Sequence, residues 1–538
     1  MTSGVVCILT AGRGTRMGQS LAWLNKALLP VGDRAAISHL IDRFGPEKRY
    51  VIGLGHLADQ VRGYLEIAHP GIVFDFVDIE PVSGPGSGPG RSLLCCADAI
   101  GHDEPFFFAP CDALIGPGID LNAPGDWVGT ARVSEAESVE FCNFRLDGGL
   151  VAGIADKVRV SPEDHSAFTG VMRIESCSAF WRALAESGER GGTVQGELQV
   201  SAGLDAIRAG GNLRAQEIEW TDLGNQEAYR AELRRRSGFD FTKPGEALYV
   251  LHGRVIKLFE RVSSASGRVQ RARAARCGVF PEVLDAAEGF VAYRFVEGET
   301  LYGTIDHELL GRLLRWVKAE LWTPVKVARD EFAGACDAFY RGKTFERLEM
   351  LEASGGLIHE PSFVDGVALP PVRDLLAGID WDRLASGGTP VVFHGDLQFD
   401  NVLLRVDGGF TLLDWRQDFA GRLDAGDLDY DLAKMIGGIR LDYAAIKAKG
   451  VRYEDAHRGS VLGYPSCRHA EELERSVFTF ARSIGRDVWR LELLVGLIHL
   501  NMAPLHAAPF DLLLRDLARQ ELALALGIGK DATERAAV

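Results

Sequence analysis

Three polar residues in the second half of the chain have the spacing of a phosphoryl-transfer site. The segment His394–Asn401 reads HGDLQFDN and places Asn401 five residues after Asp396. Asp414 follows thirteen residues later, at the end of an apolar run. In such an arrangement the first carboxylate, Asp396, accepts the proton of an attacking hydroxyl, while Asn401 and Asp414 hold Mg²⁺ against the phosphates of ATP. This series is the most specific motif of the chain.

A second chemical motif lies near the N-terminus, directly after a predicted strand. Residues 9–17 read LTAGRGTRM, and residues 25–30 read NKALLP. Glycines let the backbone approach a ligand closely and turn N–H groups toward phosphate oxygens, and Arg16 and Lys26 supply cations for a triphosphate. We therefore predict catalytic roles for Arg16 and Lys26. The predicted nucleotide contacts of this loop are Ala11, Gly12, Gly14 and Thr15.

The elements that must position the N-terminal motif alternate between two periodicities. Short β-type runs over residues 5–10, 50–54, 72–79 and 106–109 alternate with helix-like segments over residues 35–44 and 57–68. This alternation predicts βαβ units and a mainly parallel sheet. In such a sheet ligands bind beyond the carboxyl ends of the strands, so the loops after Leu9, Ile79 and Ala109 are the expected place for chemistry.

A basic, turn-rich segment over Arg234–Glu246 divides the chain. We expect one domain over residues 1–235 and a second over residues 236–538. The second begins with a small antiparallel sheet over residues 247–259 and 289–296, and helical periodicity dominates from about Leu301 onward.

With Arg16 and Lys26 at this spacing, the N-terminal motif resembles the sugar-phosphate and alcohol-phosphate nucleotidyltransferases, over roughly residues 1–235. The resemblance implies an α/β Rossmann-like domain in which a substrate phosphate attacks the α-phosphorus of an NTP and expels pyrophosphate. It places the segment Ser83–Leu94, SGPGSGPGRSLL, at the loop that contacts the nucleobase. The predicted contacts there are Gly88, Gly90 and Ser92.

Further N-terminal residues match the same family pattern. Asp112 follows an apolar strand at the carboxyl edge of the sheet, where a carboxylate would hold Mg²⁺, and Asp222 in WTDLGN matches the second metal ligand. Lys157, in IADKVRV, matches the lysine that contacts the acceptor phosphate, which implies a catalytic role. Glu197 either faces the acceptor pocket or is an exposed carboxylate.

The C-terminal motif, together with GDLDYDLAK over Gly426–Lys434, resembles the aminoglycoside phosphotransferase and choline kinase superfamily over roughly residues 240–538. The resemblance implies an α+β protein-kinase-like domain with a large helical lobe. Lys257 in VIKLF then matches the strand lysine that holds the ATP phosphates, and Tyr293 and Phe295 lie at the hinge whose backbone contacts adenine. The arginine-rich segment after Lys257 offers no glutamate to pair with this lysine.

Four aspartates near this motif have two interpretations. They could form an anionic pocket for a cationic substrate such as choline or an amino sugar. Because aspartate commonly caps turns and helices, we favour a structural role. These residues are Asp424, Asp427, Asp429 and Asp431.

Composition limits the classes of partner. The formal net charge of −16 argues against nucleic acid and anionic membranes, which need concentrated Lys and Arg. Nine cysteines without a CxxC pair, and an N-terminus without an export signal, lead us to expect a cytoplasmic protein. The apolar stretch Leu493–Ile498 is too short to span a membrane and predicts a core helix. Homo-oligomerisation stays open.

Together the two halves predict a bifunctional enzyme with Mg²⁺ at both sites. The kinase would phosphorylate a small alcohol, polyol or amino alcohol with ATP, and the transferase would couple that phosphate to a nucleotide, with CTP favoured, for capsule or other surface polysaccharide. One alternative is a sugar 1-kinase joined to a UTP- or GTP-dependent sugar-1-phosphate nucleotidyltransferase. Another is a nucleotide-sensing regulatory protein with an inactive site.

Overall fold

Two units, each with its own core, make up the chain. The computed structural model describes residues 4–18, 21–81, 83–84, 86–236, 245–456 and 459–528. Grouped by packing, unit 1 comprises Met1–Ala265 with Asp285–Ala292, and unit 2 comprises Ser266–Leu284 with Tyr293–Val538.

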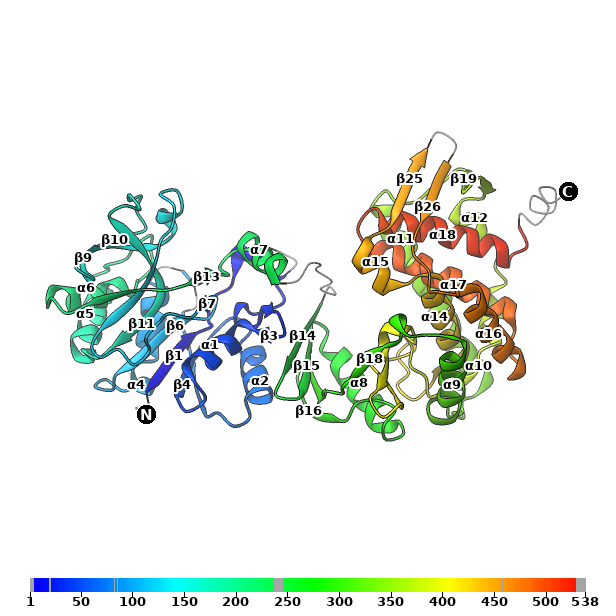
Figure 1. The fold of residues 1–538 in the computed structure, drawn as a ribbon, viewed down its shortest axis with the longest axis horizontal. Helices are drawn as coiled ribbons and strands as arrows, with labels where there is room; N and C mark the ends of the chain where they lie inside the picture. Colours follow the sequence, from blue (N-terminus) through cyan, green and yellow to red (C-terminus); the bar gives the residue numbers. More distant parts are fainter. Residues whose placement is uncertain are drawn as a thin grey trace. The chain divides into compact units, whose positions relative to one another are not determined.

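A mixed sheet forms the centre of unit 1. Its strands are β1 (Val5–Leu9), β4 (Arg49–Leu54), β5 (Phe74–Asp78), β6 (Phe106–Pro110), β8 (Trp127–Ala131), β9 (Cys142–Asp147), β10 (Leu150–Asp156), β11 (His165–Ile174) and β12 (Arg214–Glu217). The nine strands lie in the order β5-β4-β1-β6-β11-β8-β12-β10-β9. Figure 1 labels β1, β4, β6 and β11 near the centre of this sheet. β1 pairs in parallel with β4 and β6, whereas β11 runs antiparallel to β6 and β8. The predicted α/β fold is confirmed. The strands from β5 to β6 are parallel, whereas the second half of the sheet is mixed, with β12 parallel to β8 and the other pairs antiparallel.

Helices cover both faces of this sheet. They are α1 (Ala36–Phe44), α2 (Ala58–Ala68), α3 (Pro89–Cys95), α5 (Cys177–Glu189) and α6 (Ser201–Ala209). Successive side chains of β1 point to opposite faces, so Val6 and Ile8 join one core with α1 and α2, while Val5 and Cys7 join the other with α3, α5 and α6. Burial on both sides explains why β1 reads as a continuous apolar run.

A short ribbon brings a late segment of unit 1 back to the strand end. β7 (Ala113–Ile115) pairs antiparallel with β13 (Trp220–Asp222), and Asp222 lies opposite Ala113. The helix α7 (Gln226–Arg236) follows. This register places Asp222 beside Asp112, although the two residues are far apart in the sequence.

The hairpin that follows packs on unit 1. It consists of β14 (Glu246–Leu251) and β15 (Arg254–Phe259), in a four-stranded sheet with β16 (Val283–Ala287) and β17 (Phe290–Arg294). Tyr249 is fully buried, its hydroxyl donates to the Leu28 carbonyl at 2.6 Å, and its ring lies 4.8 Å from that of Tyr64. Packing therefore groups this hairpin with unit 1. The predicted split between residues 235 and 236 stays a prediction, since packing alone does not show where one folding domain ends.

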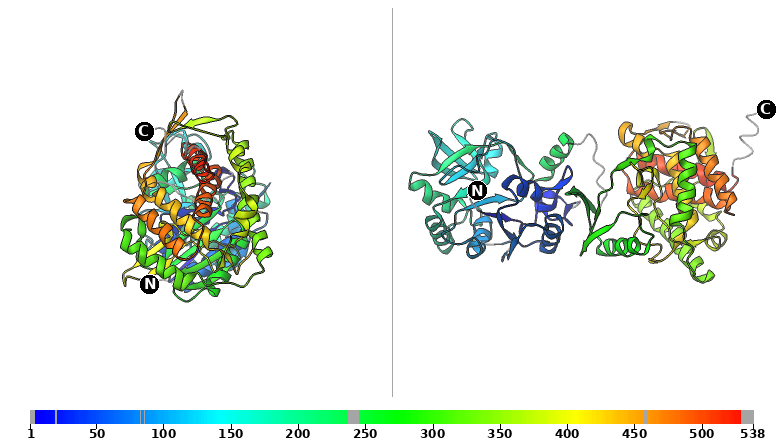
Figure 2. Two further views of the ribbon diagram at one scale, coloured as in Figure 1. Left: turned by 90° about the vertical axis from the view of Figure 1, so that its right-hand side faces the viewer. Right: turned by 60° about the horizontal axis from the view of Figure 1, so that its bottom comes forward.

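Helices dominate unit 2, as predicted. They include α9 (His307–Trp316), α10 (Arg329–Asp337), α11 (Lys343–Ala353), α14 (Leu428–Arg440), α15 (Tyr443–Lys449), α16 (Ala470–Ser483), α17 (Val488–Met502) and α18 (Phe510–Ala525), which Figure 2 shows from two further directions. A small sheet in the order β18-β22-β23 joins Gly298–Thr300 (β18), Val402–Arg405 (β22) and Phe410–Leu412 (β23). Residues Val488–Leu505 meet the length and hydropathy of a membrane span, but 67% of this stretch is buried inside the fold.

The close approach of α17 to α18 depends on Gly496. A Cβ at this position would lie 2.9 Å from the Leu522 side chain and 3.2 Å from its backbone nitrogen. Gly496→Ala should therefore destabilise unit 2 by about 1–3 kcal/mol through overpacking, measured by urea unfolding.

Gly334 in α10 is the matched control, because a Cβ there would meet nothing within 4 Å. Gly334→Ala should be neutral or stabilise by up to about 1 kcal/mol through helix propensity. Equal effects of the two substitutions would contradict the packing argument.

Candidate functional site

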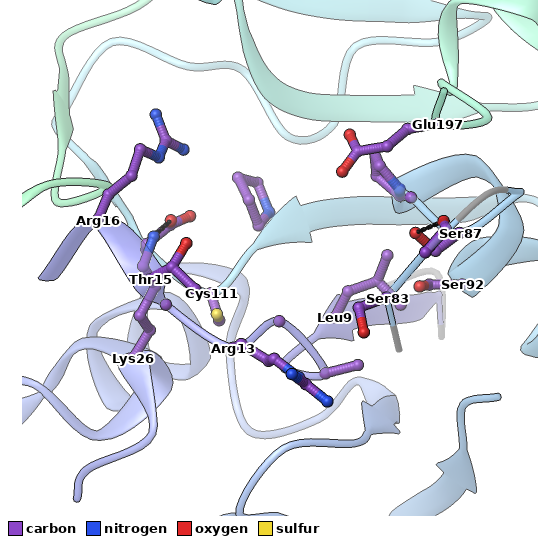
Figure 3. A pocket seen from close by; sticks show the side chains of 18 of the residues that line it. Leu9, Arg13, Thr15, Arg16, Lys26, Ser83, Ser87, Ser92, Cys111 and Glu197 are labelled. Atoms are coloured by element: carbon purple, nitrogen blue, oxygen red, sulfur yellow. Dashed lines mark hydrogen bonds and ion pairs between the residues drawn. The ribbon is translucent and has the colours of Figure 1, made fainter. Parts of the chain in front are cut away.

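The loop after β1 lines a cavity of about 790 Å³ at the carboxyl ends of β1 and β6. Figure 3 shows Thr15, Arg16 and Lys26 on one side of this cavity and Ser83, Ser87, Ser92 and Glu197 on the other. Gly14 has a φ of 62°, and a Cβ there would lie 3.1 Å from the Lys26 side chain, so both backbone and space favour glycine. The predicted loop residues Ala11, Gly12, Gly14 and Thr15 all line the cavity.

The glycine-rich loop on the other side lies against the segment after Gly196. The Gly90 amide donates to the Leu198 carbonyl at 2.8 Å, and the Leu198 amide donates to the Ser87 carbonyl at 2.8 Å. A Cβ at Gly88 would lie 2.8 Å from the Glu197 Cβ, and one at Gly90 would lie 2.9 Å from the Gln199 backbone. Gly88 and Ser92 line the cavity, whereas Gly90 packs on the neighbouring backbone. Their contacts with a nucleotide stay predictions.

Lys26 contacts the predicted metal-binding carboxylate of Asp112 directly and the turn of Asp222 through Gly224. Its ammonium group donates to Asp112 Oδ2 at 3.0 Å and to the Gly224 carbonyl at 2.9 Å. Asp222 accepts from the Gly224 amide at 2.8 Å. Burial, followed by the negative charge of Asp112, raises the pKa of Asp222. Two neighbouring carboxylates that repel each other, one of which lines the cavity, are a donor set that Mg²⁺ fits.

Asn25 holds this lysine in place, a role that the sequence motif did not reveal. Its side chain accepts from the Ala27 amide at 2.9 Å and donates to the carbonyls of Thr10 at 3.0 Å and His56 at 2.6 Å. Asn25 is buried and thereby ties the lysine turn to the ends of β1 and β4. Its only sequence signal is its position directly before Lys26.

Arg16 lines the cavity, and its positive charge partly offsets the raised pKa of Asp222, whereas Lys157 lies at Glu197. Arg16 is 60% exposed and lies 3.3 Å from Glu140. Lys157 has a φ of 51° and forms an ion pair with Glu197 at 3.6 Å. Glu197 lines the cavity, so Lys157 lies beside the cavity wall at Glu197 rather than at Asp112 and Asp222. The catalytic roles of both cations stay predictions.

The predicted catalytic loop of unit 2 is assembled around His394. Its buried ring donates from Nε2 to the Leu413 carbonyl at 2.8 Å and accepts at Nδ1 from the Asp396 amide at 3.1 Å. Burial lowers the pKa of His394 to about 4, so the ring is neutral near pH 7 and can make both hydrogen bonds. His394 thereby ties Asp396 to the residue directly before Asp414.

Asn401 completes this loop. Its amide group donates to the Asp396 carbonyl at 2.8 Å and to Asp396 Oδ2 at 3.1 Å, and its backbone carbonyl accepts from the Leu413 amide at 2.8 Å. These bonds bring Asp396, Asn401 and the start of the Asp414 turn together. Asp414 itself has a φ of 54°. The oxygen donors of Asn401 and Asp414 suit Mg²⁺, which in proteins keeps several waters and takes other ligands from substrate phosphates.

The described ranges contain no group of three or more His, Cys, Asp or Glu residues arranged to hold a metal ion. Each candidate site instead offers two side chains with oxygen donors, the carboxylates of Asp112 and Asp222 in unit 1, and the amide of Asn401 with the carboxylate of Asp414 in unit 2. Phosphate and water would complete the coordination in both.

The arginine-rich helix α8 (Val262–Ala274) contacts the catalytic loop of unit 2 with arginines. Arg268 donates to the Trp415 carbonyl at 3.0 Å and lies 3.6 Å from Asp414 Oδ1. Arg271 donates to the carbonyls of Phe393 and Arg416. Lys257 is buried and lies 4.0 Å from Glu246 on the neighbouring strand. Helix α8 has no glutamate in its sequence, and its arginines hold the catalytic loop instead.

The predicted hinge residues differ in burial. Tyr293 is buried, with its ring 5.8 Å from that of Trp415, whereas the Phe295 side chain is 46% exposed. A role of their backbone groups in binding adenine stays a prediction.

The four aspartates considered for a cationic substrate are engaged in ion pairs and backbone hydrogen bonds. Asp427 and Asp429 have no exposed surface and pair with Arg490 at 2.6 and 2.5 Å. Asp431 accepts from the amides of His394 at 2.8 Å and Gly395 at 2.6 Å. Asp424 pairs with Arg422 at 2.8 Å. The structural interpretation therefore holds for these residues.

Two models of protein families match separate segments of the chain. Residues 6–119 match the model of the MobA-like NTP transferase domain, and residues 267–468 match that of the phosphotransferase enzyme family. None of the curated proteins matches the chain in sequence.

Three solved structures are similar to part of the chain. A UDP-glucose pyrophosphorylase complexed with UDP-glucose is 17% identical, with a TM-score of 0.34, over 44% of this chain and 98% of that chain. UDP-glucose pyrophosphorylase from Acinetobacter baumannii is 14% identical, with a TM-score of 0.36, over 44% and 93%. CTP:phosphocholine cytidylyltransferase from Streptococcus pneumoniae is 15% identical, with a TM-score of 0.36, over 44% and 100%.

Removing Arg490 tests whether the buried aspartates are structural. Arg490→Met would leave Asp427 and Asp429 without their shared buried partner, so we expect a loss of about 3–5 kcal/mol in the free energy of unfolding. The matched control is Arg383→Met, because Arg383 pairs with Asp487 at 2.8 Å with both side chains about half exposed. This variant should lose less than about 1 kcal/mol. A similar small loss in both variants would refute a structural role.

Proposed function

Because the chain joins a MobA-like NTP transferase domain to a domain of the phosphotransferase enzyme family, we propose that its two sites act in sequence on one small molecule. Unit 2 phosphorylates a hydroxyl with ATP, and unit 1 couples the resulting phosphate to a nucleotide and releases pyrophosphate. The observation that carries this proposal is that each unit brings together its own set of charged and polar residues. In unit 1 these are Lys26, Asp112 and Asp222, and in unit 2 they are Asp396, Asn401 and Asp414.

In the kinase step, the oxygen of the acceptor hydroxyl attacks the γ-phosphorus, and Asp396 takes the proton of that hydroxyl. Asn401 holds one oxygen of the Asp396 carboxylate at 3.1 Å and so fixes the direction from which the hydroxyl approaches. His394 keeps the loop in this conformation through its two hydrogen bonds. When bound at either site, Mg²⁺ neutralises phosphate charge and orients the reacting groups.

In the transferase step, the residues of unit 1 stabilise negative charge at the α-phosphate. The loop containing Gly12 and Gly14 lines the cavity, where its backbone N–H groups would bind phosphate oxygens. Lys26 lies 3.0 Å from Asp112 and supplies a positive charge at the same cavity. The attacking nucleophile is already a phosphate oxygen, so this step needs no general base.

We also propose the substrates, the pathway and the cellular location of the enzyme. CTP is the favoured nucleotide, and the acceptor is a small alcohol, polyol or amino alcohol. The enzyme acts in the cytoplasm, and its product is a precursor of capsule or other surface polysaccharide. The alternative is a sugar 1-kinase with a UTP- or GTP-dependent transferase. It would use the same catalytic residues, because only the pockets that hold base and acceptor would differ.

A screen with two readouts tests the proposed function. Pyrophosphate release is measured with each of the four NTPs against a panel of alcohol and sugar phosphates, and ADP release with the unphosphorylated compounds. We expect one compound series to react in both assays. Activity in one assay only, or with two unrelated series, would contradict a sequential pathway.

The two activities should be separable by single substitutions. Asp112→Asn, with Asp222→Asn as a second variant, should lower pyrophosphate release by at least about 100-fold and leave ADP release unchanged. Asp396→Asn should do the reverse, because it removes the proton acceptor of the kinase step alone. Loss of both activities in a folded single variant would show that one site serves both reactions.

A further inference from the structure

Three cations gather beside the catalytic carboxylate of unit 2. They are Lys343 at the start of α11, Lys434 in α14, and Arg416, which follows the Asp414 turn, and we call them the cationic patch. Lys434 Nζ lies 2.7 Å from Asp396 Oδ1. Arg416 packs on the same loop, since its amide donates to the His394 carbonyl at 3.0 Å and a Cβ on Gly395 would lie 2.6 Å from the Arg416 Cβ.

Aromatic rings, rather than carboxylates, hold two of these cations. Lys343 Nζ lies 4.5 Å from the centre of the Phe339 ring and 5.7 Å from that of Tyr430. The Arg416 guanidinium lies 4.9 Å from the same Phe339 ring. Within the part of the chain that the structure describes, neither Lys343 nor Arg416 has a carboxylate within the 4.0 Å of an ion pair.

Asp396 pairs with Lys434 and partly offsets the charge of Lys343, but the carboxylates of α14 do not neutralise the patch. The buried aspartates of α14 pair with Arg486 and Arg490 or accept backbone hydrogen bonds, so their charges are already balanced elsewhere. Burial and the nearby charges of Arg416 and Lys434 hold the pKa of Lys343 well below its usual value. An anion placed among these cations would reverse that shift and relieve their mutual repulsion.

The two oxygens of Asp396 separate the metal side of the site from the patch. Oδ2 accepts from Asn401, which with Asp414 forms the predicted metal side, whereas Oδ1 contacts Lys434. A hydroxyl that approaches Asp396 from the helical lobe therefore carries the remainder of its molecule toward Lys434, Lys343 and Arg416. The cationic patch is thus placed to contact the acceptor.

We propose that the compound phosphorylated at Asp396 carries an acid group, a carboxylate or a phosphate, which the cationic patch binds. This inference rests on the proposed kinase function. Among the proposed acceptors it favours alcohols and polyols that carry an acid group, such as hydroxy acids and phosphorylated alcohols, and it excludes simple amino alcohols. In the step, the acceptor oxygen bonds to the γ-phosphorus, the bond from phosphorus to the bridging oxygen breaks, ADP keeps that electron pair, and the hydroxyl proton passes to Asp396.

Matched acceptors test the proposal on the full-length wild-type protein. ADP release and binding by calorimetry are measured with glycerol, glycerate and glycerol 3-phosphate, with sorbitol and gluconate, and with choline, ethanolamine and glucosamine. We expect at least one acid-bearing compound to exceed its neutral counterpart by about ten-fold or more in kcat/KM, as charge-assisted recognition requires. The cationic compounds should neither bind nor react.

Variants of the patch distinguish an acid group on the acceptor from the γ-phosphate of ATP. Lys343→Gln and Arg416→Gln should each raise the KM of the acid-bearing compound about ten-fold and leave the KM of ATP unchanged. Lys343→Arg keeps the positive charge and should keep the KM of the acid-bearing compound close to the wild-type value. The control is Lys449→Gln, since Lys449 is an exposed lysine at the end of α15. Circular dichroism establishes that each variant is folded.

Three results would overturn the proposal. One is faster ADP release with neutral or cationic compounds than with the acids, which would leave the kinase function intact. Another is a raised KM for ATP alone in the two glutamine variants, which would assign the patch to the γ-phosphate. The third is that no acid-bearing compound binds or reacts at up to about 10 mM. Acids that bind without any ADP release would instead contradict the proposed kinase function.

Discussion

A lysine in contact with the key carboxylate recurs at both candidate sites, and the chemistry of each depends on it. Lys26 lies 3.0 Å from Asp112, and Lys434 lies 2.7 Å from Asp396. The chain has a formal net charge of −16, so phosphate groups can approach these carboxylates only where local cations and a metal offset the repulsion. Each lysine is mostly buried, which strengthens its pairing and keeps it where phosphate chemistry takes place.

Structural elements far apart in the sequence hold these pairs. In unit 1, Asn25 links the lysine turn to the ends of two strands, and the pairing of β7 with β13 brings Asp222 to Asp112. In unit 2, the neutral ring of His394 links the two halves of the catalytic loop. Asp431 then fixes the start of that loop through the His394 and Gly395 amides. Such preorganised side chains carry reactive geometry on rigid supports.

The sequence was most informative where chemistry depends on local spacing. The glycines after β1, the Asp396 to Asn401 spacing and the strand before Asp414 were all recognisable, because each is set within a few residues. The alternating apolar runs likewise predicted the strands and helices around the first site.

What sequence reasoning missed depends on contacts between distant segments. The mixed second half of the unit 1 sheet, and the packing of the Tyr249 hairpin on unit 1, arise from tertiary pairing. The cationic patch went unnoticed because Lys343, Arg416 and Lys434 come from three separate elements. No short motif contains all three residues. Their common location is visible only once α11, α14 and the catalytic loop are in place.

The transfer of one phosphorus atom through both sites tests the account most directly. The wild-type protein is given ATP labelled in its γ-phosphate, an unlabelled second NTP and a hydroxyl compound that supports ADP release, and the nucleotide-linked product is isolated. If the sites act in sequence, the label appears in that product, between the nucleotide and the acceptor. A product without label, or label that stays in the simple phosphate ester when the second NTP is abundant, would contradict the account.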